Sequence, residues 1–92
     1  MEIDELGRVL FGRACRLRLA LWILEQSNRR FYQSEPPTSV IVQSAAAIEL
    51  QRFASIGMLS VAPAKEHRRI YYQRTNSRLW RAIEAIRDAA EG

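Results

Sequence analysis

Cysteine and histidine are nearly absent from this sequence of 92 residues, which contains one of each, Cys15 and His67. A single cysteine excludes a disulfide framework within the chain, so we expect a protein of the reducing cytoplasm. One cysteine and one histidine also exclude a multi-cysteine zinc site, and we expect neither a metal nor a cofactor. The same scarcity leaves no nucleophile–base pair at a recognisable spacing, so the sequence does not predict an enzyme.

Long hydrophobic runs are missing as well. The longest apolar stretch, residues 19–24, is far shorter than the ~20 residues that span a bilayer, so we expect no membrane partner. The acidic first residues are followed by no signal-peptide core, which also favours a cytoplasmic protein. Hydrophobic residues nevertheless make up 48% of the chain, and this proportion predicts one folded domain over residues 1–92.

Positive charge is concentrated in two segments of the chain, whose net charge is +4. Residues 8–30 hold six arginines against one glutamate, and residues 65–81 hold Lys65 and five arginines against one glutamate. Thirteen of the 14 cations are arginine, which suits paired hydrogen bonds with phosphate or guanine. The pattern indicates an anionic partner such as nucleic acid, although codon bias in a GC-rich genome and a solvated surface give the same excess.

Apolar residues recur at helical spacing through most of the chain. This periodicity predicts four main helices, over residues 2–11, 14–26, 45–56 and a last one that ends near residue 90. In the helix over 45–56, Ile48, Phe53 and Ile56 fall near one apolar face, and Ser44 is the expected N-cap.

Shorter elements are expected between the main helices. Ser34, followed closely by two prolines, predicts a short helix over residues 35–41, whose β-branched end is alternatively extended. Aromatic and β-branched residues predict extended segments at residues 31–32, 58–61 and 70–74. The last two form a hairpin with a charged tip. Because Tyr71 and Tyr72 alternate across a strand, one of them is expected to face the core and the other the surface.

The order of these elements defines an α+β fold that is mainly α-helical. A helix followed by a hairpin with a basic tip is typical of a winged helix-turn-helix, with a two-stranded β-hairpin wing and N- and C-terminal helices. In that fold the recognition helix, here about residues 44–56, enters the major groove of duplex DNA. The wing, here about residues 63–70, approaches the backbone or the minor groove.

Three segments also carry a resemblance to a known family. They are the leucine repeat of residues 14–24, the helix-to-strand segment of residues 43–59, and Arg68-Arg69-Ile70-Tyr71-Tyr72. In the order and spacing of these segments the chain resembles ArsR-like winged-helix transcriptional regulators from Leu10 to Gln73. The resemblance implies a dimeric DNA-binding transcription regulator. Metal sensing is not carried over, because Cys15 and His67 alone cannot build a metal cluster.

The chain departs from this family in two places. Ala47, Ile48 and Glu49 stand where the recognition helix usually carries Ser, Arg and His, and the prolines at 36–37 replace the usual first helix of the turn. Glu49 is expected to repel phosphate unless it accepts a hydrogen bond from cytosine or pairs with Arg52.

Candidate DNA contacts lie on the expected recognition helix, on the wing tip and on a loop. Those on the helix are Gln43, Ser44, Ala45, Ala47, Ile48, Gln51 and Arg52. Of these, the polar side chains are expected to bond to base edges, and Ala45 and Ala47 to touch thymine methyl groups. Those on the wing tip are Lys65, His67, Arg68 and Arg69. On the loop, Arg29 and Arg30 are expected to hold backbone phosphates.

The short chain also predicts a homodimer, because specific DNA binding normally needs two half-sites. The terminal helices carry apolar stripes that are expected to form the dimer interface. The residues expected there are Leu6, Leu10, Phe11, Trp80, Ile83 and Ile86. Arg16 and Arg18 are expected to pair either with Glu25 or with the acidic N-terminus of the partner chain.

Two other functions fit the same sequence. A winged-helix protein–protein interaction module in a transcription complex, without strong DNA binding of its own, would present residues 45–48 and Glu49 to a protein partner. A sensor would respond to a small molecule through a pocket at the dimer interface, or to oxidation through the thiol of Cys15.

Overall fold

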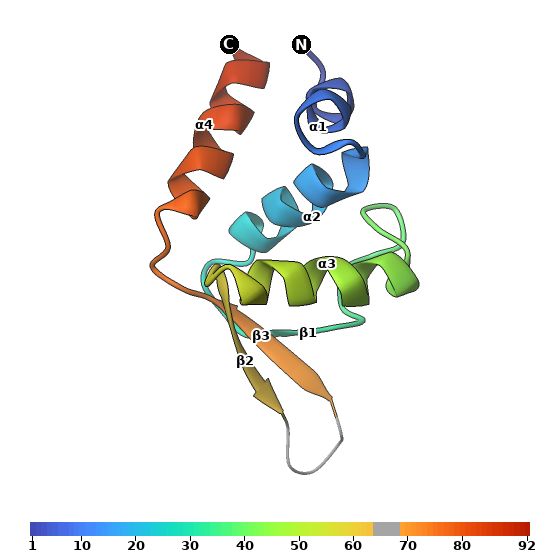
Figure 1. Cartoon of the computed structure of the whole chain (residues 1–92), viewed down its shortest axis with the longest axis vertical. Coiled ribbons are helices and arrows are strands. Elements are labelled where there is room, and N and C mark those ends of the chain that lie inside the picture. The colour runs from blue at the N-terminus through green and yellow to red at the C-terminus, as the bar shows by residue number, and fades with distance from the viewer. Residues whose placement is uncertain (64–68) are drawn as a thin grey trace.

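A computed structural model of the chain describes residues 1–63 and 69–92 (Figure 1). These residues form four helices and three short strands: α1 (Ile3–Phe11), α2 (Ala14–Glu25), β1 (Phe31–Tyr32), α3 (Gln43–Ser55), β2 (Leu59–Pro63), β3 (Ile70–Arg74) and α4 (Leu79–Glu91). The fold is therefore mainly helical with a small antiparallel sheet, which agrees with the expected α+β class. Among the described helices, none has both the length and the apolar composition needed to cross a bilayer.

The sheet has three strands in the order β1-β3-β2, all antiparallel to their neighbours. The expected two-stranded hairpin is therefore wrong in strand number, because β1 adds to its free edge. Phe31 and Val61 lie opposite Tyr72 in the register, and the rings of Phe31 and Tyr72 stack at 6.0 Å between centroids. Tyr72 is buried and Tyr71 is half-buried on the other face, so the expected alternation of the two tyrosines is confirmed.

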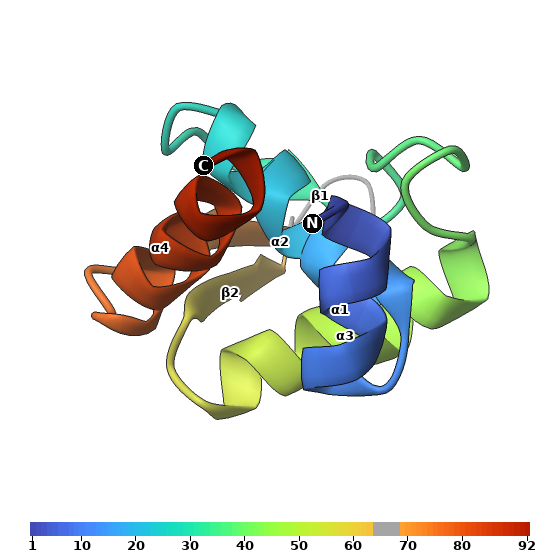
Figure 2. The ribbon, with the colours of Figure 1, turned by 90° about the horizontal axis from the view of Figure 1, so that it is seen from above.

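The core forms around α2, which lies between α1 and α4 (Figure 2). The core helix α2 buries five aliphatic side chains, Ala14, Leu17, Leu19, Ala20 and Ile23. Trp80 and Ile83 enter the same core from α4, at the three-residue spacing that places two side chains on one helical face. Helix α3 contributes Ala46, Leu50 and Phe53 to the same core.

Two glycines determine how α1 meets α2. A Cβ added at the buried Gly7 would lie 3.2 Å from Cβ of Leu17 and 3.4 Å from Cα of Ala14, so the two helices cross where no side chain separates them. Gly12 has φ of +79°, in the left-handed region, and ends α1. The chain can then turn directly into α2 at Ala14.

The segment between β1 and α3 contains turns and no helix, so the short helix expected over residues 35–41 is wrong. Within residues 35–41 one turn forms, in which the amides of Val40 and Ile41 donate to the carbonyl oxygen of Pro37 at 2.9 and 3.2 Å. Prolines at 36 and 37 cannot donate backbone hydrogen bonds, and Ile41 is buried in the core shortly before α3 begins.

Helix starts also differ from expectation. The N-cap of α3 is Val42, with no side-chain cap, so the expected capping by Ser44 is wrong and Ser44 lies in the first turn. At α4 the hydroxyl oxygen of Ser77 accepts a hydrogen bond from the amide of Leu79 at 3.2 Å. The N-cap of α4 is Arg78, whose own side chain makes no capping hydrogen bond.

Candidate nucleic-acid interface

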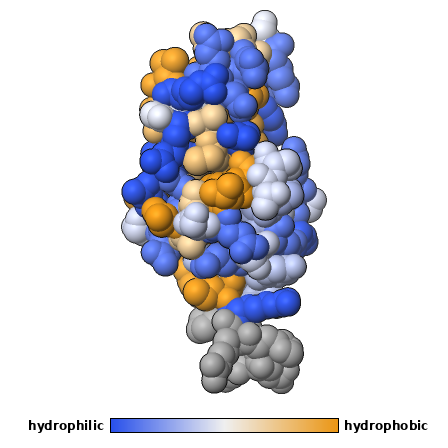
Figure 3. Space-filling view, turned by 90° about the vertical axis from the view of Figure 1, so that its right-hand side faces the viewer, coloured by the Kyte–Doolittle hydropathy of each residue, from blue (hydrophilic) through white to orange (hydrophobic). Residues whose placement is uncertain are grey.

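The exposed side of α3 carries most of the predicted DNA contacts. Facing away from the core, this side presents Gln43, Ser44, Ile48, Gln51 and Arg52, all exposed, with Ala47 half-buried among them. Ala45 lies half-buried at the border of this side. In a space-filling view from the side of α1 and the start of α3, hydrophobic groups form separate patches among hydrophilic ones (Figure 3).

The apolar face expected for this helix is wrong in part. Ile48 and Ile56 are 52% and 58% exposed, whereas Phe53 is buried as expected. The buried positions are instead Ala46, Leu50 and Phe53 together with the carboxylate residue Glu49. They recur at spacings of three and four residues, which is the period of one helical face.

Glu49 is fully buried and is the only acidic residue of α3. Arg16 of α2 donates two hydrogen bonds to it, from Nε to Oε2 at 2.6 Å and from Nη2 to Oε1 at 3.1 Å. Arg52 donates from Nη1 to Oε1 at 2.8 Å, and Nη1 of Arg13 lies 4.0 Å from the same oxygen. One buried carboxylate therefore gathers three guanidinium groups at the junction of α2 and α3.

The charge of Glu49 results from two opposed effects. Burial alone would raise the pKa of its carboxyl group, but the hydrogen bonds and positive charges of Arg16 and Arg52 outweigh burial, so the pKa is lowered. The carboxylate is thus ionised at neutral pH and satisfied inside the protein. The exposed side of α3 consequently presents arginine charge and no carboxylate.

The ion pairs of this region partly match expectation. The pairing of Glu49 with Arg52 is confirmed. The pairings expected for Arg16 and Arg18 are not found among the described residues, since Arg16 binds Glu49 and Nε of Arg18 lies 3.3 Å from Asp4 of the same chain. The sequence gives no local signal for the contact of Arg16 with a residue 33 positions away.

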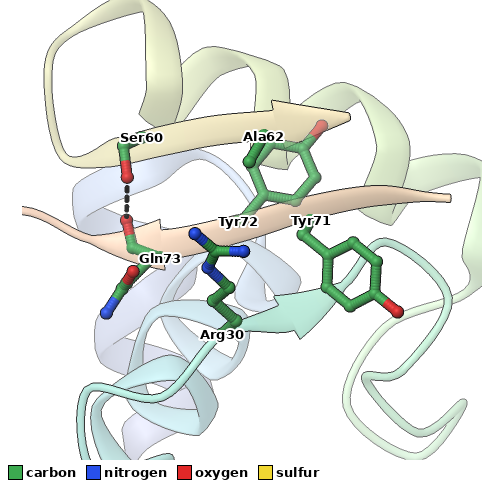
Figure 4. Close-up of a pocket in the computed structure, with 6 residues that line it drawn as sticks. All are labelled: Arg30, Ser60, Ala62, Tyr71, Tyr72 and Gln73. Carbon is green, nitrogen blue, oxygen red and sulfur yellow. Dashed lines mark hydrogen bonds between the residues drawn. The ribbon is translucent and has the colours of Figure 1, made fainter. Parts of the chain in front are cut away.

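The two loop arginines differ in what they contact. Arg29 forms an ion pair with Glu35 and donates to Oε1 of Gln26 at 2.7 Å. The hydrogen bond from Arg29 is the main reason that the pKa of Glu35 is lowered. The charge of Arg29 is therefore largely neutralised by Glu35. Arg30 is exposed and extends from the start of β1 toward β3, beside Tyr71 (Figure 4).

Of the contacts predicted at the hairpin tip, Arg69 lies among the described residues. The predicted contacts Lys65, His67 and Arg68 lie outside the described residues. Arg69 is described and exposed, and its guanidinium carbon lies 4.6 Å from the ring centroid of Tyr32.

The predicted dimer residues divide into two groups. Trp80 and Ile83 are only 5% and 8% exposed, so the expectation that the fold leaves them uncovered is wrong. The indole Nε1 of Trp80 donates to the carbonyl oxygen of Met58 at 2.8 Å inside the core. Leu10 is exposed, whereas Leu6, Phe11 and Ile86 are half-buried.

A groove of about 320 Å³ lies between the end of α1, the end of α3 and α4. Its lining is mostly apolar and includes Phe11, Ile56, Leu79, Ile83 and Ile86. Part of the predicted dimer set therefore meets at this groove. Within the described part of the chain, no group of three or more His, Cys, Asp or Glu side chains is arranged to hold a metal ion.

Comparison of the chain with protein-family models, with curated proteins and with solved structures gave no match in any of the three.

Proposed function

We propose that this chain is a winged helix-turn-helix regulator of transcription that binds duplex DNA as a homodimer, with α3 as its recognition helix. The observation that carries the proposal is the exposed side of α3. Gln43, Ser44, Gln51 and Arg52 share that side, and the only carboxylate of the helix is buried beneath it. A helix that presents amide, hydroxyl and guanidinium groups without negative charge is suited to the major groove.

The position of the hairpin supports the same function. Directly after α3, Gly57 adopts φ of +81° and the chain enters β2, so the hairpin β2–β3 follows α3 without an intervening element. In a winged helix this hairpin is the wing, which contacts the DNA backbone beside the recognition helix. In this proposal Arg69 holds a phosphate at the base of the wing.

Apolar groups on the exposed side of α3 have a role in base reading. Ile48 lies between the polar residues Ser44 and Gln51 and is 52% exposed. An aliphatic side chain in the major groove makes its specific contact with the methyl group of thymine. Ile48 and the neighbouring Ala47 are therefore assigned to thymine positions of the target.

In the proposed dimer each chain supplies one recognition helix, so two are present. The apolar groove, which Leu79 lines, and the exposed Leu10 of α1 support association between two chains through α1 and α4. Two copies of α3 can then contact two half-sites of one DNA duplex.

Selection from a pool of random duplex fragments, followed by a gel shift at low and high salt, tests the proposal. We expect retained fragments to share a sequence, and binding to weaken with salt because phosphate contacts release counterions. The double variant Ser44→Ala/Gln51→Ala is expected to lose selectivity. The matched control Arg81→Gln removes a charge from α4, away from the exposed side of α3, and is expected to keep it. Wild-type protein that retains no duplex at low salt would contradict the proposal.

A protein-interaction module remains the second candidate, and one observation favours it. Val42 and Ile48, at the start and middle of the exposed side of α3, are 57% and 52% exposed. Exposed aliphatic groups on one helix are typical of a surface that meets another protein. Glu49 has no part in such a surface, because it is buried. Failure to retain duplex at low salt would favour this candidate.

A further inference from the structure

The outward face of the sheet, which faces away from the core, carries a pair of tyrosines that have no part in the proposed role of α3. Tyr32 of β1 and Tyr71 of β3 lie opposite each other in the register. Their ring centroids are 6.2 Å apart and the ring planes meet at 71°. Both side chains are half-buried, whereas Phe31 and Tyr72, the next residues along each strand, point into the core. The sheet therefore divides its aromatic residues between the core and an accessible face.

Two cationic side chains flank this pair at opposite ends. Arg69 lies over the ring of Tyr32, at 4.6 Å from its centroid. At the other end Arg30 reaches toward β3 and lines a small hollow with Tyr71 and Gln73 (Figure 4). Arg69 and Gln73 are four positions apart, so their Cα atoms stand about 13 Å apart where the chain is extended. The tyrosines lie between them.

The described residues of this face carry no unpaired negative charge. None of the three strands contains Asp or Glu. Glu35, whose Oε1 lies 3.3 Å from the amide nitrogen of Tyr32, is neutralised by its ion pair with Arg29. The groups beside the tyrosines are instead neutral and polar, with the hydroxyl of Ser60 donating to the carbonyl oxygen of Gln73 at 3.4 Å.

Aromatic rings between arginines, without carboxylates, fit a ligand that has both flat faces and negative charge. Single-stranded nucleic acid has both, because its unpaired bases offer π-faces and its phosphates lie alongside. Duplex DNA does not fit the tyrosines, since its base faces are stacked within the helix. Arginine can bind phosphate through paired hydrogen bonds and can also stack against a base.

We propose that the outward face of the sheet binds single-stranded nucleic acid. Tyr32 and Tyr71 stack with bases, and Arg30 and Arg69 hold the flanking phosphates. This site is separate from the exposed side of α3 and shares Arg69 with the proposed duplex contacts. The proposal does not depend on duplex binding by α3.

Fluorescence anisotropy with a labelled oligodeoxythymidine of about ten nucleotides tests the site, a length within the range bound by known single-strand modules. Tyr71→Leu is expected to weaken binding roughly 5- to 100-fold, as loss of one base–aromatic stack does. Tyr71→Phe keeps the ring and is expected to retain the affinity. Circular dichroism and thermal unfolding of both variants verify that each remains folded.

Two charge variants distinguish a specific phosphate contact at this site from nonspecific attraction of the oligonucleotide to the positively charged protein. Arg30→Gln is expected to weaken binding and to reduce the salt slope by about 0.7, the value for one phosphate contact on a single strand. Arg81→Gln removes the same charge from α4 and is expected to change neither quantity appreciably. Equal effects of the two variants would overturn the proposal, as would equal affinities of Tyr71→Leu and Tyr71→Phe or a wild-type protein that does not bind the oligonucleotide.

The duplex measurement keeps the two proposals distinguishable. Tyr71→Leu is expected to bind a selected duplex like the wild type, and Ser44→Ala/Gln51→Ala to bind the single strand like the wild type. A wild-type protein that binds the single strand but no duplex would refute the role of α3 and leave the sheet site intact. A wild-type protein that binds the duplex but not the single strand would refute the sheet site and leave the role of α3 intact.

Discussion

Arg16 and Glu49 join α2 to α3 through two hydrogen bonds between a half-buried guanidinium and a fully buried carboxylate. A buried carboxylate is tolerated only when it is paired and hydrogen-bonded. Arg16 supplies this pairing from a second helix, so the position of α3 relative to the core depends on it. Arg52, exposed on α3 itself, completes the shell of donors.

Removal of Arg16 is expected to destabilise the fold. In Arg16→Ala, Glu49 keeps Arg52 but loses both bonds from α2, and we expect a loss of about 3 kcal/mol, within the range for broken buried pairs. Urea unfolding monitored by circular dichroism measures it. The double variant Arg16→Met/Glu49→Leu is expected to lose less, because no charge is left buried. A double variant less stable than Arg16→Ala would contradict this account.

Stability is also expected to fall in acid. The pKa values of Glu35 and Glu49 are lowered from the ordinary 4.5, so the unfolded chain takes up protons more readily than the folded one. Their contribution is complete above about pH 4.5 and is lost as the pH falls through the lower folded values. Urea unfolding across this range measures the slope. Glu49→Gln is expected to be less stable at neutral pH and to show a shallower acid decline, and an unchanged slope would contradict the assignment.

The crossing of α1 and α2 predicts a steric effect at Gly7. Gly7→Val places methyl groups against Leu17 and Ala14, where even a Cβ is tight, and is expected to cost about 1–3 kcal/mol, as overpacking does. Thermal unfolding measures the loss. Gly12→Ala meets no neighbour within 4 Å and tests backbone strain alone, with an expected loss of about 1 kcal/mol. Unchanged stability of Gly7→Val would show that the crossing is looser than described.

Thymine reading by Ile48 can be tested on the nucleic acid itself. In a selected duplex, replacement of thymine by uracil removes the methyl group but keeps base pairing. We expect the wild type to lose about fourfold in affinity per contacted methyl, from the ~0.8 kcal/mol of a buried CH₂ group. Ile48→Ala is expected to bind both duplexes with similar affinity. Equal binding of both duplexes by the wild type would contradict the role of Ile48 without affecting that of α3.

Association through α1 and α4 predicts the effect of a charge on the exposed side of α1. Leu10 is half exposed, so Leu10→Glu is expected to leave the fold intact and to separate the dimer into single chains. Sedimentation velocity over a range of concentrations measures the change. Glu5→Gln, an exposed substitution on the same helix, serves as the control. A wild-type protein that sediments as a single chain at every concentration would contradict the predicted dimer.

Much of the helical framework could be predicted from hydrophobic spacing. The bounds of α1 and α2 differ by one residue at most from those expected, and β3 has the expected range. Strand β1 was expected only as an extended segment, because two residues show no periodicity and its partner lies some 40 positions further along the chain. The turns after β1 were mistaken for a helix because prolines fit a first helical turn as readily as an extended loop.

The candidate site was less predictable, for a physical reason. Polar residues are usually placed on the surface of a predicted helix, so Glu49 was expected to face the ligand. Its spacing from Ala46 and Phe53 is the signal for burial, but only the distant Arg16 makes burial of a carboxylate tolerable. The tyrosine pair on the outward face likewise depends on the register of β1 with β3, which composition does not reveal.

The carbonyl oxygen of Met58 accepts two hydrogen bonds, from the indole of Trp80 at 2.8 Å and from the amide of Thr75 at 3.0 Å. Met58 lies in the connection between α3 and the hairpin. Its carbonyl oxygen therefore links this connection both to the first turn of α4 and to the residue that follows β3. A movement of α4 that carries Trp80 away from Met58 would therefore leave one indole N–H and one of the two bonds of this carbonyl unsatisfied inside the core, which costs free energy.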